Sequence, residues 1–201
     1  MTRDSVPDPF TEPDRRSSIK PRPIIPVPAS MSGETRGRRV LIGLPGNGWR
    51  GDLRADNKVV QGSRTYIPIM AEGEWYRAET EQSEVFAPLI PIERVWVEDL
   101  GIAIMNTDPG SDSSLLASLD EPPRRNPANS LDTKSLTGRR VVEIQSDGSE
   151  RRDLRAVTEL FMSDSNAICA RVARESEWYQ WTWSGKIPRT MSVPAHFLWV
   201  E

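Results

Sequence analysis

The residues of this chain that could act in catalysis are few and poorly grouped. The sequence of 201 residues contains one cysteine, Cys169, and one histidine, His196. A cysteine nucleophile needs a base beside it. In the internal repeat described below, these two residues lie opposite Tyr66 and Glu93, so neither belongs to the plan that the two copies share. We expect Cys169 to be a small, buried or half-buried filler.

Other candidate chemistry is equally weak. Residues 43–48 are rich in glycine but lack the Gly-Lys-Ser/Thr of a phosphate loop, so they are better read as a hairpin turn. Acidic residues such as Glu79, Glu81, Asp52 and Asp153 are typical of solvated strand faces or ion pairs. One cysteine and one histidine do not make the spacing of a metal site. We therefore expect no enzyme activity, no cofactor and no metal.

Composition sets further limits. The net charge is -3, from 26 basic and 29 acidic residues, which gives no global attraction to nucleic acid or to an anionic membrane. No apolar run approaches the length of a membrane span, about 18 residues. A single cysteine forms no intramolecular disulfide, which fits a reducing compartment. We expect a cytoplasmic protein with no membrane partner.

The elements that would position a site emerge when the chain is compared with itself. Residues 37–55 and 138–156, offset by 138 − 37 = 101, share nine identities in nineteen positions, where ordinary composition would give roughly one. The shared blocks are Gly-Arg-Arg-Val and Asp-Leu-Arg-Ala. The offset grows to 177 − 74 = 103 at a shared Glu-Trp-Tyr. The two extra residues of the second copy are placed in a surface loop at 163–166.

Each copy is predicted to contain five short strands. Asn-Gly and Asp-Gly, which are strong hairpin signals, follow the first strand of each copy. A second hairpin is expected to end on the shared Trp-Tyr. The predicted strands include 40–42, a hairpin from 66–70 to Trp75-Tyr76, and 94–97; the second copy repeats them at 141–144, 168–172 to Trp178-Tyr179, and 197–200.

The opening Gly-x-x-Val, the hairpin glycine and the strands that carry Asp52-Leu53 and Asp153-Leu154 resemble those of SH3-like or Sm-like small β-barrels. The resemblance covers each repeat and implies a bent five-stranded sheet that closes on itself. The Asp-x-x-x-Asn loop pattern of the Sm family is missing, so the resemblance implies no RNA-binding residues. Similarity to Tudor-type modules assigns no aromatic-cage residues either.

The predicted organisation follows from these patterns. Residues 1–36 are rich in proline and form an extended or disordered N-terminal arm. The first barrel covers 37–105, a Pro/Ser-rich linker covers 106–137, and the second barrel covers 138–201. The predicted fold class is therefore mostly β, with two tandem small SH3-like five-stranded barrels, an extended arm and a long linker.

The tryptophans divide into shared and unshared ones. Trp75 aligns with Trp178 and Trp96 with Trp199, and residues that two diverged copies share are expected in the core. The unshared tryptophans are Trp49, Trp181 and Trp183.

If residues 177–183 form a strand whose Trp178 points inward, Tyr179, Trp181 and Trp183 face outward together. An exposed aromatic strip needs a cover, which could be the other barrel, the chain's own tail or a partner. Trp49 is predicted either to join such a contact or to cap the end of its barrel. The arm could contribute Ile24 and Ile25 to a partner.

The basic residues allow two interpretations. Arg151 and Arg152, with Arg139, Arg140 and Arg155, could be strand-edge residues that keep the protein soluble. Together with Trp181 and Trp183, they could instead form a platform for single-stranded DNA or RNA.

The function predicted from these features is binding without catalysis. The leading hypothesis is an adaptor or assembly subunit, virion-borne if a phage encodes it, that contacts other protein subunits or copies of itself. The alternative is a nucleic-acid-binding protein that uses the second barrel.

Overall fold

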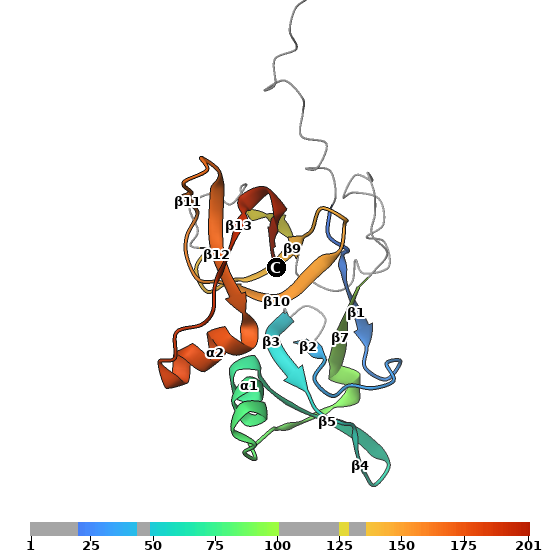
Figure 1. Ribbon diagram of the computed structural model, residues 1–201. Helices are drawn as coiled ribbons and strands as arrows, with labels where there is room; N and C mark the ends of the chain where they lie inside the picture. Colours follow the sequence, from blue (N-terminus) through green and yellow to red (C-terminus); the bar gives the residue numbers. More distant parts are fainter. Residues whose placement is uncertain (1–19, 44–48, 101–124, 129–135) are drawn as a thin grey trace, which may run out of the picture.

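The computed structural model describes residues 20–43, 49–100, 125–128 and 136–201. This part of the protein is mostly β, with two curled antiparallel sheets and two short helices (Figure 1). The first sheet contains β1 (Ile24–Pro28), β2 (Arg39–Gly43), β3 (Trp49–Ala55), β4 (Val59–Gln61), β5 (Arg64–Ala71), β6 (Leu89–Pro91) and β7 (Val95–Leu100). The second contains β8 (Asn126–Pro127), β9 (Arg140–Ile144), β10 (Glu150–Ala156), β11 (Phe161–Met162), β12 (Ile168–Arg174), β13 (Met191–Pro194) and β14 (Leu198–Val200).

The two sheets use their strands in the same order. The first runs β1-β7-β2-β3-β5-β4, with β6 on β5. The second runs β8-β14-β9-β10-β12-β11, with β13 on β12. A short 3-10 turn precedes the last strand of each sheet, at Ile92–Arg94 and Ala195–Phe197. Residues aligned in the sequence comparison therefore occupy corresponding strands.

Each sheet curls around its own apolar core, because alternate residues of its strands are aliphatic and point inward. The first core is built from residues such as Val40, Leu53, Ile67, Ile69 and Val97. Its counterpart in the second sheet contains Val141, Leu154, Ala170, Val172 and Val200. The four shared tryptophans, which we expected in the core, are only half-buried: Trp75, Trp96, Trp178 and Trp199.

The first hairpin of each copy is present as predicted. β2 pairs with β3 and β9 with β10, both antiparallel. The Asp-Gly turn closes through a bond from the Gly148 amide to the Gln145 carbonyl, 2.9 Å long, and Gly148 has φ of 82°. The two-residue insertion at 163–166 lies in the turn between β11 and β12, where the Ser163 amide bonds the Ala167 carbonyl at 2.9 Å.

The second hairpin of each copy was predicted wrongly. The strands β5 and β12 lead directly into helices, α1 (Glu72–Glu81) and α2 (Glu175–Ser184), and not into a returning strand. The shared Trp-Tyr therefore lies in the first turns of a helix. Each copy also has more than five strands, because short strands precede and follow those that the sequence indicated.

The helices have recognisable ends. Each carries two glutamates in its first turn, where the helix dipole favours negative charge. α2 ends at Gly185, whose φ of 72° is left-handed and whose amide bonds the Trp181 carbonyl. α1 ends in the same way at Gln82. This left-handed residue is a common helix terminator.

The segments outside the predicted barrels contribute strands. Ile24–Pro28, which the sequence placed in the arm, forms β1 on the edge of the first sheet. Asn126–Pro127, placed in the linker, forms β8 on the corresponding edge of the second. Ala29 and Ala128, which follow these strands, are both fully buried in the cores.

The shared glycine at the start of each copy has a structural reason. Gly37 and Gly138 have φ of 71° and 81°. An added Cβ would lie 3.5 Å from the ring of Trp75 at Gly37, and 3.5 Å from the ring of Trp178 at Gly138, so the tryptophan leaves room and only the backbone requires glycine.

We expect Gly138→Ala to lower the free energy of unfolding by about 1–2 kcal/mol, because a residue with a Cβ is strained in the left-handed region. Gly33→Ala is the matched control, since Gly33 has open space around it and no positive φ. Chemical denaturation measures both variants, and equal stabilities would contradict this explanation.

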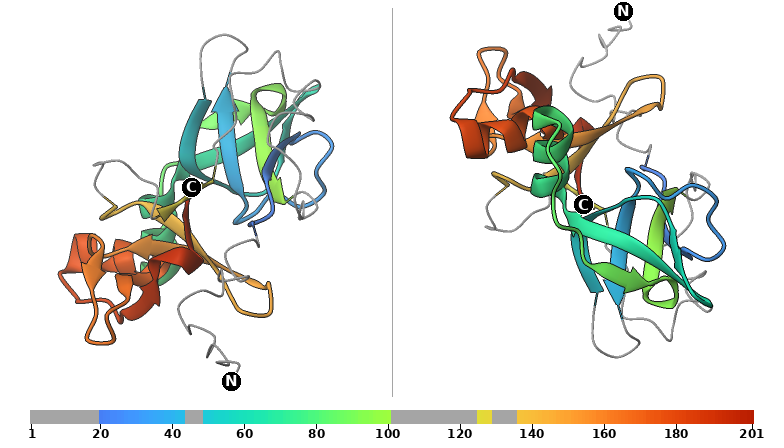
Figure 2. Two further views of the ribbon diagram at one scale, coloured as in Figure 1. Left: turned by 90° about the horizontal axis from the view of Figure 1, so that it is seen from above. Right: turned by 90° about the horizontal axis from the view of Figure 1, so that it is seen from below.

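The two sheets lie on opposite sides of a shared junction. α1 and α2 pack against each other there, and the C-terminal end of the chain lies between the sheets (Figures 1 and 2). β3 and β10 approach the junction as well (Figure 1).

Candidate functional site

The junction between the two sheets is filled with buried charges. Arg39 and Arg140 each occupy the first position of their strand, because the block Gly-Arg-Arg-Val ends a turn and begins β2 or β9. The block Asp-Leu-Arg-Ala places Arg54 opposite Arg39 and Arg155 opposite Arg140. All four arginines are at most 8% exposed. The two shared sequence blocks therefore place two pairs of guanidinium groups at the junction between the sheets.

The helices supply the negative charges. Glu72 and Glu175 are the first residues of α1 and α2, and their side chains are fully buried. A buried carboxylate is tolerated only when it is paired and hydrogen-bonded. Its position at a helix N-terminus adds a favourable dipole.

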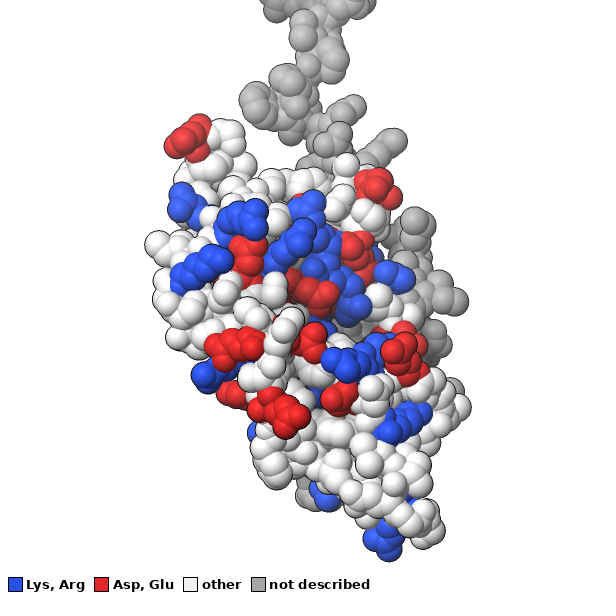
Figure 3. Space-filling model, turned by 60° about the horizontal axis from the view of Figure 1, so that its bottom comes forward, with Lys and Arg blue, Asp and Glu red and all other residues white. Residues whose placement is uncertain are grey.

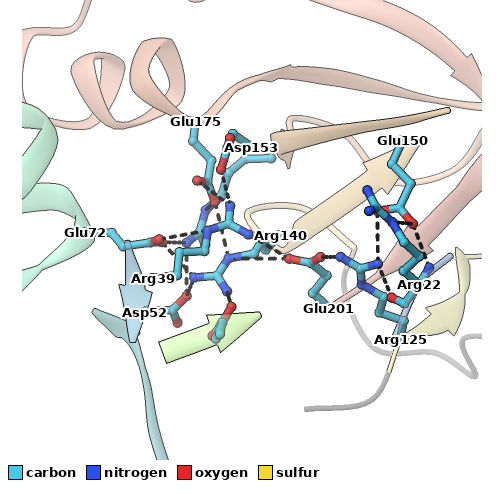
Figure 4. Close-up of polar contacts among 12 residues, drawn as sticks. Arg22, Arg39, Asp52, Glu72, Arg125, Arg140, Glu150, Asp153, Glu175 and Glu201 are labelled. Atoms are coloured by element: carbon cyan, nitrogen blue, oxygen red, sulfur yellow. Dashed lines mark hydrogen bonds and ion pairs between the residues drawn. The ribbon is translucent and has the colours of Figure 1, made fainter. Parts of the chain in front are cut away.

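The pairing crosses between the sheets in both directions (Figure 4). Arg39 lies 3.3 Å from Glu72 of its own half and 2.7 Å from Glu175 of the other. Arg140 lies 3.4 Å from Glu175 of its own half and 2.9 Å from Glu72 of the other. Each glutamate therefore joins the two halves, and we call the set Arg39, Arg54, Glu72, Arg140, Arg155 and Glu175 the ion cluster.

Two bulges add a second reciprocal contact. Asp52 and Asp153 lie where the β2–β3 and β9–β10 registers shift, and both have positive φ, 56° and 58°. Asp52 accepts from Arg140 at 3.0 Å, and Asp153 pairs with Arg39 at 2.9 Å. Asp tolerates the left-handed region better than most residues, which suits an aspartate at this position in both sheets.

Two tyrosines complete the junction. The rings of Tyr76 and Tyr179 stack at 5.4 Å between α1 and α2. Arg54 donates to the Tyr76 hydroxyl at 2.8 Å and Arg155 to that of Tyr179 at 2.6 Å. Burial raises the pKa of both hydroxyls well above the ordinary value. The negative charge of Glu175 adds to this effect at Tyr76, and that of Glu72 adds to it at Tyr179. They stay neutral and act as hydrogen-bonding groups.

The cluster fixes the charge of its members. Burial acts to lower the pKa of Arg140, but Glu72 and Glu98 raise it above the ordinary value. Burial acts to raise the pKa of Glu72, but Arg140 and Arg39 lower it to about 2. Near neutral pH Arg140 and Glu72 are therefore both charged, as an ion pair requires.

The network continues along the second sheet. Arg39 reaches Glu201 at 2.9 Å, and Arg125, just before β8, also pairs with Glu201. Arg125 further contacts Glu150, 3.4 Å away, which in turn accepts from the Arg22 amide. On the surface, basic and acidic side chains are mixed across the middle of the face in Figure 3.

The predicted aromatic strip is not a strand face. Residues 177–183 are helical, so Tyr179, Trp181 and Trp183 do not share one side as alternate strand residues would. Tyr179 points its hydroxyl into the ion cluster. Trp181 is 38% exposed and Trp183 is half-buried. Trp49 lies in β3, where its backbone pairs with Gly43.

The remaining predicted contact residues are dispersed. Arg151 is exposed and pairs with Glu143 at 3.0 Å. Arg152 is half-buried, and burial lowers its pKa. Ile24 is buried in β1, whereas Ile25 is 38% exposed. Whether these residues contact a partner stays a prediction.

Sequence reasoning missed the ion cluster. The sequence predicts solvated strand-face, turn or ion-pair residues for Asp52 and Asp153, and strand-edge or phosphate-binding residues for the arginines. One signal pointed to the cluster: the shared blocks contain four charged residues in each segment, Arg-Arg in the first block and Asp and Arg in the second. Charges that two diverged copies keep at inward positions indicate mutual pairing.

The possible catalytic residues remain apart from this junction. Cys169 is buried in β12, and His196 is exposed in a 3-10 turn with its ring 4.1 Å from that of Phe197. Within the described ranges, no three His, Cys, Asp or Glu side chains are arranged to hold a metal ion. Over the same residues, no helix is long and apolar enough to cross a membrane.

Comparison with protein-family models, with curated proteins and with solved structures finds no match to this chain.

Proposed function

We propose that this protein is a non-enzymatic binding protein, an adaptor or assembly subunit built from two copies of one SH3-like unit. The observation that carries the proposal is the reciprocal ion cluster. Its buried carboxylates and guanidinium groups are engaged with one another across the two sheets. Groups held in this way serve to fix the halves relative to each other and present a rigid surface.

The surface of the second sheet supplies a candidate contact. β11 is an edge strand, and its Met162 lies directly opposite Ile168 of β12. Both side chains are more than half exposed, at 60% and 51%. An apolar cross-strand pair at an open sheet edge suits the addition of a partner strand or an apolar surface. Trp181 on α2 provides a further exposed aromatic side chain.

The arginines support this proposal over nucleic-acid binding. A single-strand platform needs guanidinium groups that are free to meet phosphates. Arg140 and Arg155 are instead buried against carboxylates, and Arg151 pairs with Glu143. Fewer positive charges of the second sheet are therefore available than the sequence suggested.

We expect Met162→Ser with Ile168→Ser to leave the melting temperature nearly unchanged and to reduce association, because the exchanged side chains are already exposed. Val60→Ser is the matched control, since Val60 is a 71% exposed apolar residue of β4, the corresponding strand of the first sheet. Light scattering measures the mass of the purified protein over a range of concentrations. Quantitative cross-linking in the native host measures contacts with other subunits.

If the double variant keeps both its mass and its cross-links, the contact surface is wrong. If the wild type is monomeric and forms no cross-links, the assembly function itself fails. Retention on single-stranded DNA or RNA that weakens steeply with salt would favour the alternative function.

A further inference from the structure

One pair of corresponding carboxylates differs between the halves. Glu98 and Glu201 align at an offset of 201 − 98 = 103, and the side chains of both are only 2% exposed. Arg39 donates to Glu201 at 2.9 Å, whereas Arg140 lies 3.6 Å from Glu98 Oε2. The longer separation is an electrostatic contact beyond hydrogen-bond distance. Among the described residues Glu98 Oε2 has no hydrogen-bond donor, although its side chain is only 2% exposed.

The second half gives Glu201 two additional cations. Arg125 precedes β8, pairs with Glu201 directly, and has a side chain only 4% exposed. Arg152 lies in the β10 bulge and acts on the same carboxylate. Burial acts to raise the pKa of Glu201, but the surrounding guanidinium groups hold it below the ordinary value.

The first half lacks both cations. Pro26 of β1 lies opposite Glu98, the position that Arg125 takes relative to Glu201. Gly51 corresponds to Arg152, since 152 − 101 = 51. Neither replacement carries a charge or a hydrogen-bonding side chain. The first half therefore has no counterpart of Arg125, which pairs with Glu201 in the second, and none of Arg152.

A cleft of about 390 Å³ lies beside Glu98 and Gly51. Its lining combines carboxylates with guanidinium groups: Gly51, Asp52, Glu98, Glu201, Arg139, Arg140 and Arg155. Its volume falls within the range of small-ligand sites, about 300–1,000 Å³. A buried carboxylate oxygen that lacks a hydrogen-bond donor, on the wall of such a cleft, is costly unless a donor reaches it.

We propose that this cleft binds the guanidinium group of an arginine side chain that a partner protein presents to Glu98. The second half shows that this chemistry fits, because Arg125 pairs with the corresponding carboxylate despite the nearby Arg39 and Arg140. The inference rests on the proposed binding function for the source of the side chain, but the cleft itself can be tested without a partner.

A guanidinium group suits this cleft better than an ammonium group. It is planar, weakly hydrated and always charged, so it enters partly buried sites at lower desolvation cost. It can also donate two parallel hydrogen bonds to one carboxylate.

The titration of Glu98 agrees with an unfilled cation site. Burial raises its pKa above the ordinary value, and the positive charges of Arg140 and Arg39 are outweighed by that burial and by the negative charges of Glu201 and Glu72. A bound cation would reverse this direction.

Gly51→Arg supplies the missing cation from within the chain. An added Cβ at Gly51 meets only the Leu41 side chain, at an ordinary 3.5 Å, and Gly51 has no positive φ. We expect this variant to raise the melting temperature near neutral pH and to lower the Glu98 pKa, as followed by carboxyl NMR. Gly33→Arg is the charge-matched control, because Gly33 has open space around it. Equal effects of both variants would overturn the proposal.

Binding is tested on the intact chain with N-acetyl-arginine amide, and with its uncharged isostere N-acetyl-citrulline amide. Calorimetry should show that the arginine compound binds the wild type at least about tenfold more tightly. Glu98→Gln and Gly51→Arg should each remove this preference. Glu98→Gln should also raise the melting temperature at neutral pH, because it removes a buried charge with too few cations. Equal binding of the two compounds, or binding of inorganic phosphate in their place, would contradict a guanidinium site.

The two proposals fail separately. If the arginine compound binds but no assembly forms, the cleft stands and the adaptor function fails. If native cross-links persist in Gly51→Arg and the compound does not bind, the adaptor function stands and the cleft proposal fails.

Discussion

Glu175→Gln is expected to lower the free energy of unfolding by about 3–5 kcal/mol, the usual cost of removing one partner from a buried ionic network. The side chain is fully buried and lies 2.7 Å from Arg39 of the other half. A neutral amide of the same shape leaves the surrounding guanidinium groups under-compensated, so the loss comes from charge and not from volume. The groups that lose a partner are Arg39, Arg54, Arg140, Arg155 and Tyr76.

Glu79→Gln provides the matched control for this prediction. Glu79 pairs with Arg36 at a similar distance, 3.1 Å, but both side chains are about half exposed. Surface pairs contribute about 0–1 kcal/mol, because water screens them. Urea denaturation of both variants measures the difference. If Glu175→Gln lowered the free energy of unfolding no more than Glu79→Gln does, the cluster would not hold the halves together.

Acid is expected to unfold the protein through the same cluster, in a transition between about pH 4.5 and pH 2. The folded pKa of Glu72 is lowered from 4.5 to about 2, so the unfolded chain binds more protons in this window. Its contribution to stability is therefore complete above about pH 4.5 and is lost as the pH falls through the folded pKa. The shift corresponds to about 3 kcal/mol.

Melting temperatures recorded by circular dichroism from neutral pH down to about pH 2 measure this effect. Glu201, whose pKa is also lowered, adds to the loss in the same direction. In Glu72→Gln the stability at neutral pH should be lower and its dependence on acid flatter. A wild-type melting temperature that stays constant down to pH 2 would contradict the charge assignment.

Much of the strand arrangement could be predicted because it depends on short, continuous stretches of the sequence. Short apolar strands and Gly-containing turns placed the first hairpin and the last strand of each half correctly. For residues 72–81 and 175–184 the strand prediction was wrong, and both ranges are helices. Their Trp, Tyr and Thr residues are typical of strands. Glutamates in the first turn and a left-handed terminator at Gly185 were the helix signals that the strand interpretation overlooked.

The candidate site was less predictable than the fold. Each half contributes a single Glu to the ion cluster, and the groups that stabilise it lie far away in the chain, as for Glu175 and Arg39, 136 residues apart. The sequence around a residue shows that the residue is charged and predicts whether it lies on a strand or a helix. It does not show whether another sheet will bury that charge beside an opposite one.

The sequence by itself determined that the described chain is mostly β and which residues of its two related segments correspond. These properties follow from the periodicity of side chains along one strand and from the turn residues between strands. Only the tertiary structure decided that Glu72 and Glu175 begin helices at a shared junction, and that Pro26 lies opposite Glu98 whereas Arg125 pairs with Glu201. Pairing of buried charges depends on distances through space, and those are fixed when the two sheets pack against each other.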